Sequence, residues 1–217
     1  MTIDAGLPAL LAALRARLGG AVALVTGRTL ARLDAISGLP PQAAAGLHGL
    51  ELRFESGRTV SAGNPEGASH IARQLREQFR ADPRLVIEDK GAGVALHWRQ
   101  APERAQECIT AMKEAAAAPE FEILRGHAVV EARPRGTNKG AALAALSNHG
   151  SFAGRRPVFV GDDVTDEDAF RAAALLGGFG VKVGPGETGA HFRVSDVDEV
   201  HAWLAESLAV LTGRAAP

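Results

Sequence analysis

The densest group of side chains that could do chemistry in this sequence is a run of acids that follows a short apolar segment. Residues 158–160, Val-Phe-Val, are typical of a strand buried on both faces of a parallel sheet. Gly161 ends this strand, and five of the next seven residues are acidic. This acidic loop, residues 162–168, contains Asp162, Asp163, Asp166, Glu167 and Asp168. Because ligands of open α/β sheets bind at the carboxyl ends of the strands, the acidic loop is in a position to hold one.

Part of the acidic loop has a purely structural explanation. Thr165 and Asp168 have the spacing of a capping box, and acids in the first turn of a helix suit the helix dipole. The adjacent Asp162 and Asp163 are not explained in this way, because neighbouring carboxylates repel each other unless a cation or hydrogen-bond donors hold them. A hard cation such as Mg²⁺ is their usual partner. The pattern therefore leaves two interpretations open, a metal site and a plain loop.

A second candidate segment, Thr26-Gly27-Arg28, follows a predicted strand over residues 21–25. Taken by itself, Thr26 is best explained as the cap of the next helix. In the other interpretation, Thr26, backbone N–H groups and Arg28 surround a phosphoryl group. That interpretation gains support because Asp162 is expected at the same edge of the sheet.

Lys139 is the third candidate. It falls in the first turn of a predicted helix that Thr137 or Asn138 can cap, and the helix dipole disfavours a cation at that place. A phosphate or an aspartate that Lys139 neutralises explains the lysine better than a solvated surface position does.

The remaining elements of this part of the chain are those of a parallel α/β domain. A helix over residues 7–18 ends at two glycines, and a second helix runs to residue 36. Strands are predicted over residues 46–54 and 179–183, and an amphipathic helix around residues 200–208 closes the chain. We expect a Rossmann-like core built from residues 1–56 and 135–217.

Residues 57–134 have a different pattern. Strands predicted over 85–90, 94–99 and 128–133 are joined by tight turns, which favours an antiparallel sheet with two helices on one side. The polar face of this sheet holds Glu88, Lys90, His97, Arg99, Glu131 and Arg133. This face could simply meet water, or it could offer carboxylates and an ammonium to the hydroxyl groups of a sugar. With 5% aromatic residues and no Tyr, hydrogen bonds rather than ring stacking would then carry recognition.

Composition narrows the class of protein. A net charge of −1 gives no electrostatic footprint for nucleic acid or an anionic membrane, and no apolar run is long enough to span a bilayer. Two arginines interrupt the apolar stretch 7–25, so it is not read as a signal peptide. The single cysteine, Cys108, cannot form an internal disulfide and is expected to pack in a helix beside Met112. We expect a globular, cytoplasmic protein.

Together the motifs resemble those of the haloacid dehalogenase (HAD) superfamily, and specifically of its trehalose-6-phosphate phosphatases. The segments that resemble superfamily motifs two, three and four are Thr26-Gly27-Arg28, Asn138-Lys139-Gly140 and Gly161-Asp162-Asp163-Val164-Thr165-Asp166-Glu167. The segments that resemble the trehalose-6-phosphate phosphatases are 46–49, 88–91, 97–99 and 129–136, with Arg133 where that family often has Lys. The resemblance spans nearly the whole chain. It implies a Rossmann-like core, an antiparallel α/β cap over residues 57–134, and Mg²⁺ as the cofactor.

The resemblance also implies roles for individual residues in the hydrolysis of trehalose 6-phosphate through a phospho-aspartate. Asp162 would bind Mg²⁺ with support from Asp163 and Asp166, and Thr26, Lys139 and Asp163 would be the catalytic groups present. The residues expected to bind the substrate are Arg28, His48, Gly49, Glu88, Lys90, Glu131 and Arg133. The partner would be this small sugar phosphate, and the complete protein would be a monomer.

One motif of the superfamily has no counterpart in this sequence. The first motif, Asp-x-Asp-x-Thr at the end of the first strand, supplies the nucleophile and the acid/base, but no such pattern occurs in the 217 residues, and the one acid before Thr26 is Asp4. We therefore expect that the central strand of the sheet is missing and that the chain as given is inactive. A truncation, a late start codon or a degenerate paralogue would each give this pattern.

Two alternatives to trehalose-6-phosphate hydrolysis stay open. The chain could be a sugar-phosphate-binding protein without turnover, because the nucleophile is absent. It could also descend from a related phosphatase that acts on sucrose phosphate or a mannosyl phosphoglycerate.

Overall fold

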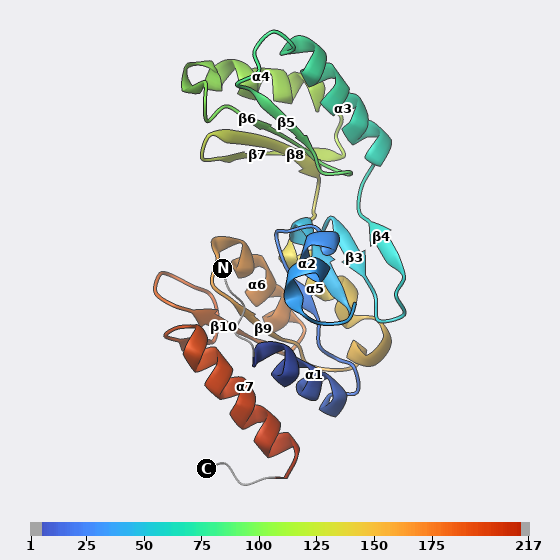
Figure 1. Cartoon of the computed structure of the whole chain (residues 1–217), viewed down its shortest axis with the longest axis vertical. Helices are drawn as coiled ribbons and strands as arrows, with labels where there is room; N and C mark the ends of the chain where they lie inside the picture. Colours follow the sequence, from blue (N-terminus) through green and yellow to red (C-terminus); the bar gives the residue numbers. More distant parts are fainter. Residues whose placement is uncertain (1–5, 214–217) are drawn as a thin grey trace. The chain divides into compact units, whose positions relative to one another are not determined.

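The computed structural model of the chain describes residues 6–213, and the chain divides into two compact units (Figure 1). The cap unit is Ser61–Thr137, and the core unit combines the residues before it with those after it. The cap limits expected from the sequence, 57 and 134, lie a few residues before these. Asp4 lies outside the described residues. No helix among residues 6–213 has the length and apolar character needed to cross a membrane.

The described residues of the core unit form two sheets. The first has the strands β1 (Leu24–Val25), β2 (Ala44–Gly46), β3 (Glu51–Arg53) and β4 (Thr59–Ser61), which lie side by side in chain order. In it β1 and β2 are parallel, and β2 and β3 are antiparallel. The second sheet has the strands β9 (Val158–Gly161), β10 (Phe179–Val183) and β11 (Phe192–Val194), all parallel, in the order β11-β10-β9.

β1 is an edge strand of the first sheet, and β9 is an edge strand of the second. Among the described residues, neither pairs with a further strand on its open side. Val25 of β1 packs against the cluster that contains Phe159 of β9, so the two edges border the same hydrophobic core. Val158 is 43% exposed. The prediction that β9 is buried on both faces is therefore wrong, because Phe159 is buried on one face while Val158 and Val160, which lie on the other face, are not fully covered. The strand expected over residues 21–25 likewise shrinks to the two residues of β1.

Helices connect and cover these strands. They are α1 (Leu7–Arg17), α2 (Leu30–Ser37), α5 (Lys139–Ser147), α6 (Glu167–Leu175) and α7 (Val197–Leu211), with 3₁₀ turns at Leu47–Gly49, Gly150–Phe152 and Val164–Asp166. On the face of the parallel sheet that α6 covers, Phe170 meets Phe159 edge to face with ring centroids 5.9 Å apart. The closing helix α7 packs along α1, and no described side chain of α7 is fully buried.

The continuous strand expected over residues 46–54 is not formed. β2 ends at Gly46 and β3 begins at Glu51, and between them Leu47, His48 and Gly49 have φ angles of 48°, 57° and 107°. These values lie outside the extended region, so the chain turns back and the two halves pair as antiparallel strands. Apolar residues in this turn are buried as they would be in a strand, which is why the pattern was misleading.

The cap unit is an antiparallel sheet with both of its α-helices on the same side (Figure 1). In sheet order its strands are β5 (Val86–Asp89), β6 (Val94–His97), β8 (Val129–Pro134) and β7 (Phe121–Gly126). Its helices are α3 (Pro65–Gln78) and α4 (Ala105–Ala115), the latter preceded by a 3₁₀ turn at Pro102–Arg104. The three predicted strands are confirmed with small shifts at their ends. The edge strand β7 was not predicted.

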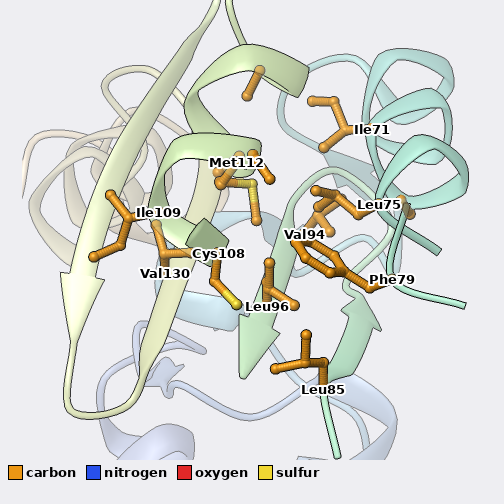
Figure 2. Close-up of a cluster of buried hydrophobic side chains, with 14 of the residues drawn as sticks. Ile71, Leu75, Phe79, Leu85, Val94, Leu96, Cys108, Ile109, Met112 and Val130 are labelled. Carbon is orange, nitrogen blue, oxygen red and sulfur yellow. The ribbon is translucent and has the colours of Figure 1, made fainter. Parts of the chain in front are cut away.

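The predicted helix-facing side of the cap sheet is also confirmed. Figure 2 shows Leu75 of α3 and Met112 of α4 among the sheet residues Val94 and Leu96. Cys108 is buried beside them, as its expected packing role requires. The cap cluster contains 18 buried residues, whereas the two clusters of the core unit contain four and three. The cap therefore has the larger hydrophobic core, although it is the smaller unit.

Candidate active site

The centre of the candidate site is a buried ion pair between Lys139 and Asp166. Lys139 Nζ lies 2.6 Å from Asp166 Oδ1, and the two side chains are 8% and 4% exposed. Lys139 is the first residue of α5, and its helix is capped by Asn138, whose side chain accepts the N–H of Ala141. The aspartate that this first-turn lysine neutralises is thus Asp166.

The capping box of the acidic loop lies two residues earlier than predicted. The box is formed by Asp163 and Asp166: the Asp163 side chain accepts the N–H of Val164 at 2.6 Å, and the Asp163 N–H donates to Asp166 Oδ2 at 2.9 Å. The prediction of a Thr165–Asp168 box is wrong because Asp166, held by Lys139, is already in place to receive the Asp163 N–H. Asp163 therefore has a structural role that the sequence did not reveal.

Asp162 is the acid of the loop that is left for a ligand. Its side chain is exposed, and its carboxylate accepts no hydrogen bond from the residues that the structure describes. Both oxygens of Asp166, by contrast, are taken by Lys139 and the Asp163 N–H. Within residues 6–213 no group of three or more His, Cys, Asp or Glu side chains converges on a metal position. One free carboxylate still fits Mg²⁺, which is commonly held by one or two carboxylates together with waters and substrate phosphate.

Thr26 is not a helix cap, so the plainer of its two interpretations is wrong. The cap of α2 is Thr29, which accepts the N–H of Arg32 at 3.1 Å. Thr26 Oγ1 instead accepts the N–H of Arg28 at 3.1 Å, two residues before the helix begins. Because Thr26 Oγ1 is the acceptor in this hydrogen bond, the Thr26 hydroxyl hydrogen stays available to a phosphoryl oxygen.

The turn at Leu47–Gly49 links Thr26 to the start of α5. The His48 N–H donates to the Thr26 carbonyl at 3.0 Å. A Cβ added at Gly49 would lie 2.8 Å from the Asn138 carbonyl oxygen, so only glycine allows this approach. The core unit thus brings the segments of Thr26, His48 and Lys139 together with the acidic loop.

The remaining predicted site residues belong to the cap unit, where they form side-chain pairs on the polar face of the sheet. Lys90 Nζ lies 2.8 Å from Glu131 Oε2, and His97 Nε2 lies 3.1 Å from Glu88 Oε2. Arg133 pairs with Glu122 of β7 at 2.7 Å. Glu122 was missed because β7 was missed; its signal was the apolar-polar-apolar segment 121–123 shortly before a glycine.

A first prediction concerns the packing of α5 on α6, which holds Lys139 against Asp166. Gly140→Ala should lower the free energy of unfolding by about 1–3 kcal/mol, as overpacked interiors do. A Cβ at position 140 would lie 2.4 Å from the backbone carbonyl oxygen of Asp168, which cannot rotate away. Urea unfolding measures the loss. The matched control is Gly189→Ala, whose Cβ would have its nearest neighbour at 3.5 Å; equal losses in both variants would contradict the close helix packing.

The profile that describes trehalose-phosphatases matches residues 1–197 of the chain. The chain belongs to the trehalose-phosphatase family. It is 41% identical over 187 residues to the trehalose-6-phosphate phosphatase of Escherichia coli strain K12, an alignment that covers 85% of this chain and 70% of the relative. It is 42% identical over 187 residues to a probable trehalose-phosphate phosphatase of Sinorhizobium fredii, which covers 85% and 71% of the two chains.

Solved structures share the fold of this chain. The crystal structure of a trehalose-6-phosphate phosphatase related protein superposes with a TM-score of 0.69 at 26% identity, over 98% of this chain and 90% of the other. A protein of Bacteroides thetaiotaomicron, described among the phosphatases of the HAD superfamily, has a TM-score of 0.66 at 15% identity, over 97% and 89% of the two chains. The predicted fold class, an HAD-like α/β core with an inserted antiparallel cap, is confirmed.

Proposed function

We propose that this chain carries the binding and part of the catalytic apparatus of a phosphatase that hydrolyses trehalose 6-phosphate to trehalose and phosphate. The observation that carries the proposal is the buried Lys139–Asp166 pair, which joins two superfamily motifs directly beside the free carboxylate of Asp162. The relatives named above act on trehalose phosphate by name, and family membership extends over residues 1–197.

Each predicted site residue of the core unit has a role in this proposal. The Thr26 hydroxyl and the Lys139 ammonium bind the phosphoryl oxygens, since a lysine in a first helical turn adds its charge to the helix N-terminus. Asp162 binds Mg²⁺, and Asp163 and Asp166 support it by fixing the turn of the acidic loop. When bound, Mg²⁺ would offset the negative charge on the phosphoryl oxygens. Arg28, His48 and Gly49 border the phosphate position.

The phosphoryl acceptor is not among these groups. We propose that the family's phospho-aspartate forms on an aspartate of an Asp-x-Asp-x-Thr segment that this sequence does not contain, and that the 217 residues alone do not turn over. The unpaired edges of β1 and β9, which border one hydrophobic core, support the view that a strand belongs there. The absence of the acceptor aspartate from this sequence also favours the second candidate function, a sugar-phosphate-binding protein without turnover.

The experiment that tests the substrate is a binding measurement, because binding does not need the acceptor aspartate. Trehalose 6-phosphate should bind to the 217-residue chain more tightly than sucrose 6-phosphate or a mannosyl phosphoglycerate, as measured by calorimetric titration in MgCl₂. If either competitor bound more tightly than trehalose 6-phosphate, that competitor would be assigned as the substrate instead.

A second prediction separates recognition of the sugar from recognition of the phosphate. Glu88→Ala, Lys90→Ala and Glu131→Ala should each weaken the binding of trehalose 6-phosphate by about 5–100-fold, the effect of one or two charge-assisted hydrogen bonds. The same variants should leave the binding of inorganic phosphate unchanged, since these side chains form pairs within the cap unit and would meet the sugar alone.

The matched control for these variants is Glu114→Ala, which removes an exposed carboxylate from α4 of the same unit. This control should change neither the affinity for trehalose 6-phosphate nor the affinity for inorganic phosphate. A parallel loss of sugar-phosphate and phosphate binding in the three variants would mean that the residues maintain the structure rather than contact the sugar.

A further inference from the structure

Lys182 is a buried cation that the proposed function does not use. It lies near the end of β10, in register with Gly161 of β9, and is 6% exposed. Its ammonium donates to the backbone carbonyl of Asp162. Burying an ammonium is unfavourable unless it gains partners, so a lysine at this place needs an explanation that a surface lysine would not need.

The other end of the acidic loop is held from the same side. Glu167, the first residue of α6, accepts the Thr188 hydroxyl at Oε1 (2.7 Å) and the Gly189 N–H at Oε2 (2.8 Å). Thr188 and Gly189 belong to the glycine-rich loop, residues 184–191, which joins β10 to β11. Burial by itself would raise the pKa of the Glu167 carboxyl, but these two hydrogen bonds and the nearby charge of Lys182 bring that pKa below its ordinary value. Glu167 therefore ties the start of α6 to the segment that contains Thr188 and Gly189.

The segment between these two anchors contains Asp162. The Asp162 carboxylate itself has no protein donor among the described residues, so what the protein fixes is the backbone from which this side chain leaves the loop. That backbone is fixed on one side by Gly161, where an added Cβ would lie 2.3 Å from Asp166 Cγ, and on the other by the Asp163–Asp166 capping box. Lys182 holds the carbonyl of the Asp162–Asp163 peptide, while the N–H of the same peptide donates to Asp166 Oδ2 at 2.9 Å.

We propose that Lys182 is a positioning residue for Mg²⁺: by holding the Asp162 carbonyl, it directs the Asp162 carboxylate toward the metal position, and the Glu167–Thr188 contact holds the far end of the same loop. The inference rests on the proposed metal role of Asp162. Groups that orient a metal ligand in this way commonly contribute a factor of 10 to 100 in metal affinity.

Two effects of Lys182 on Mg²⁺ have opposite signs, and this makes the proposal decidable. As a nearby positive charge alone, Lys182 would repel the metal, and its removal would tighten binding. As a positioning group, its removal weakens binding. We therefore expect Lys182→Met to weaken the affinity of the full chain for Mg²⁺ by about 10–100-fold, and Lys182→Arg, which keeps the charge and the donors, to restore most of it.

The measurement is a titration of the ¹⁵N-labelled 217-residue chain with MgCl₂, followed through the backbone amide signals of Asp163 and Val164. Lys113→Met is the matched control, because it removes an exposed lysine of the cap unit and should leave the affinity unchanged. Affinity in Lys182→Met equal to or tighter than that of the unaltered chain would overturn the inference while leaving the metal role of Asp162 intact.

Two further variants, Asp162→Asn and Thr188→Val, separate failure of the proposed metal site from failure of the role proposed for Lys182. Absence of Mg²⁺ binding in the unaltered chain, or equal binding in Asp162→Asn, would overturn the metal part of the proposed function and this inference with it. Should Lys182→Met fail to fold by far-UV circular dichroism, Thr188→Val tests the other anchor of the loop, since it removes the hydroxyl that Glu167 accepts. Unchanged affinity in a folded Thr188→Val variant would then overturn the proposal.

Discussion

Fusion of about 25–30 residues that carry Asp-x-Asp-x-Thr, a strand with its connecting loops, ahead of this chain should raise the rate of trehalose 6-phosphate hydrolysis from background to that of a working phosphatase. None of the 217 residues matches the aspartate that accepts the phosphoryl group. Asp163 and Asp166 are engaged in the capping box and the ion pair, and Asp162 is proposed to hold the metal. Loss of a covalent nucleophile costs on the order of 10⁶ in kcat in a well-studied serine protease. Release of inorganic phosphate from trehalose 6-phosphate in MgCl₂ measures the gain.

The same fusion should raise the stability of the core unit. The edges of β1 and β9 are unpaired among the described residues, and Val158 at the start of β9 is 43% exposed. A strand that pairs with both edges would bury Val158 and neighbouring apolar side chains, each of which contributes roughly 1.5–3 kcal/mol when fully buried. Unpaired edges also favour association between chains. The fused protein should therefore melt at a higher temperature and associate less.

The control is the same fusion with the first Asp of the motif replaced by Asn. This protein should regain the higher melting temperature without regaining turnover, which separates the nucleophile from the fold. Two outcomes would contradict the argument. One is hydrolysis by the 217-residue chain at a rate similar to that of the fusion. The other is a fusion that melts at the higher temperature and binds trehalose 6-phosphate but stays inactive.

The cap unit was predicted from the sequence in more detail than the core unit. In the cap, alternation along residues 94–98 and 128–132 directly encodes which side chains face the helices, because both faces of an antiparallel sheet have distinct environments. The resulting core, including Leu96 and Val130, is the one observed. The edge strand β7 escaped prediction because its last residues are exposed and lack the alternation.

In the core unit the errors share a physical cause, which is that local patterns were decided by non-local partners. Thr165 has the sequence spacing of a cap, but the bond from Lys139 to Asp166, 27 residues away, places the cap at Asp163. Residues 47–49 look like part of a strand, but they turn because Gly49 must approach the start of α5. The candidate residues were recognised by type and spacing. Their hydrogen-bond partners depended on the fold.

Breaking the Lys139–Asp166 pair should produce a large loss of stability in the core unit. Lys139→Met would leave the Asp166 carboxylate buried without its cation, and Asp166→Asn would leave the Lys139 ammonium buried without its anion. Removing one partner of a buried ion pair typically costs about 3–5 kcal/mol. The double variant Lys139→Met with Asp166→Asn leaves no uncompensated charge and keeps an amide oxygen for the Asp163 N–H. Its loss should therefore be well below the sum of the single losses.

The two tryptophans allow this loss to be assigned to one unit. Trp98 lies in the cap cluster and Trp203 on α7 of the core unit. In a Trp98→Phe background, urea unfolding followed by the fluorescence of Trp203 should show the destabilisation. In a Trp203→Phe background, the transition reported by Trp98 should not move, because every contact of the ion pair described above lies within the core unit.

Additive losses in the double variant would contradict the buried pair. They would show instead that Lys139 and Asp166 act independently, each with its own solvent-accessible charge. The position of Lys139 in the first turn of α5 would then need an explanation other than its pairing with Asp166.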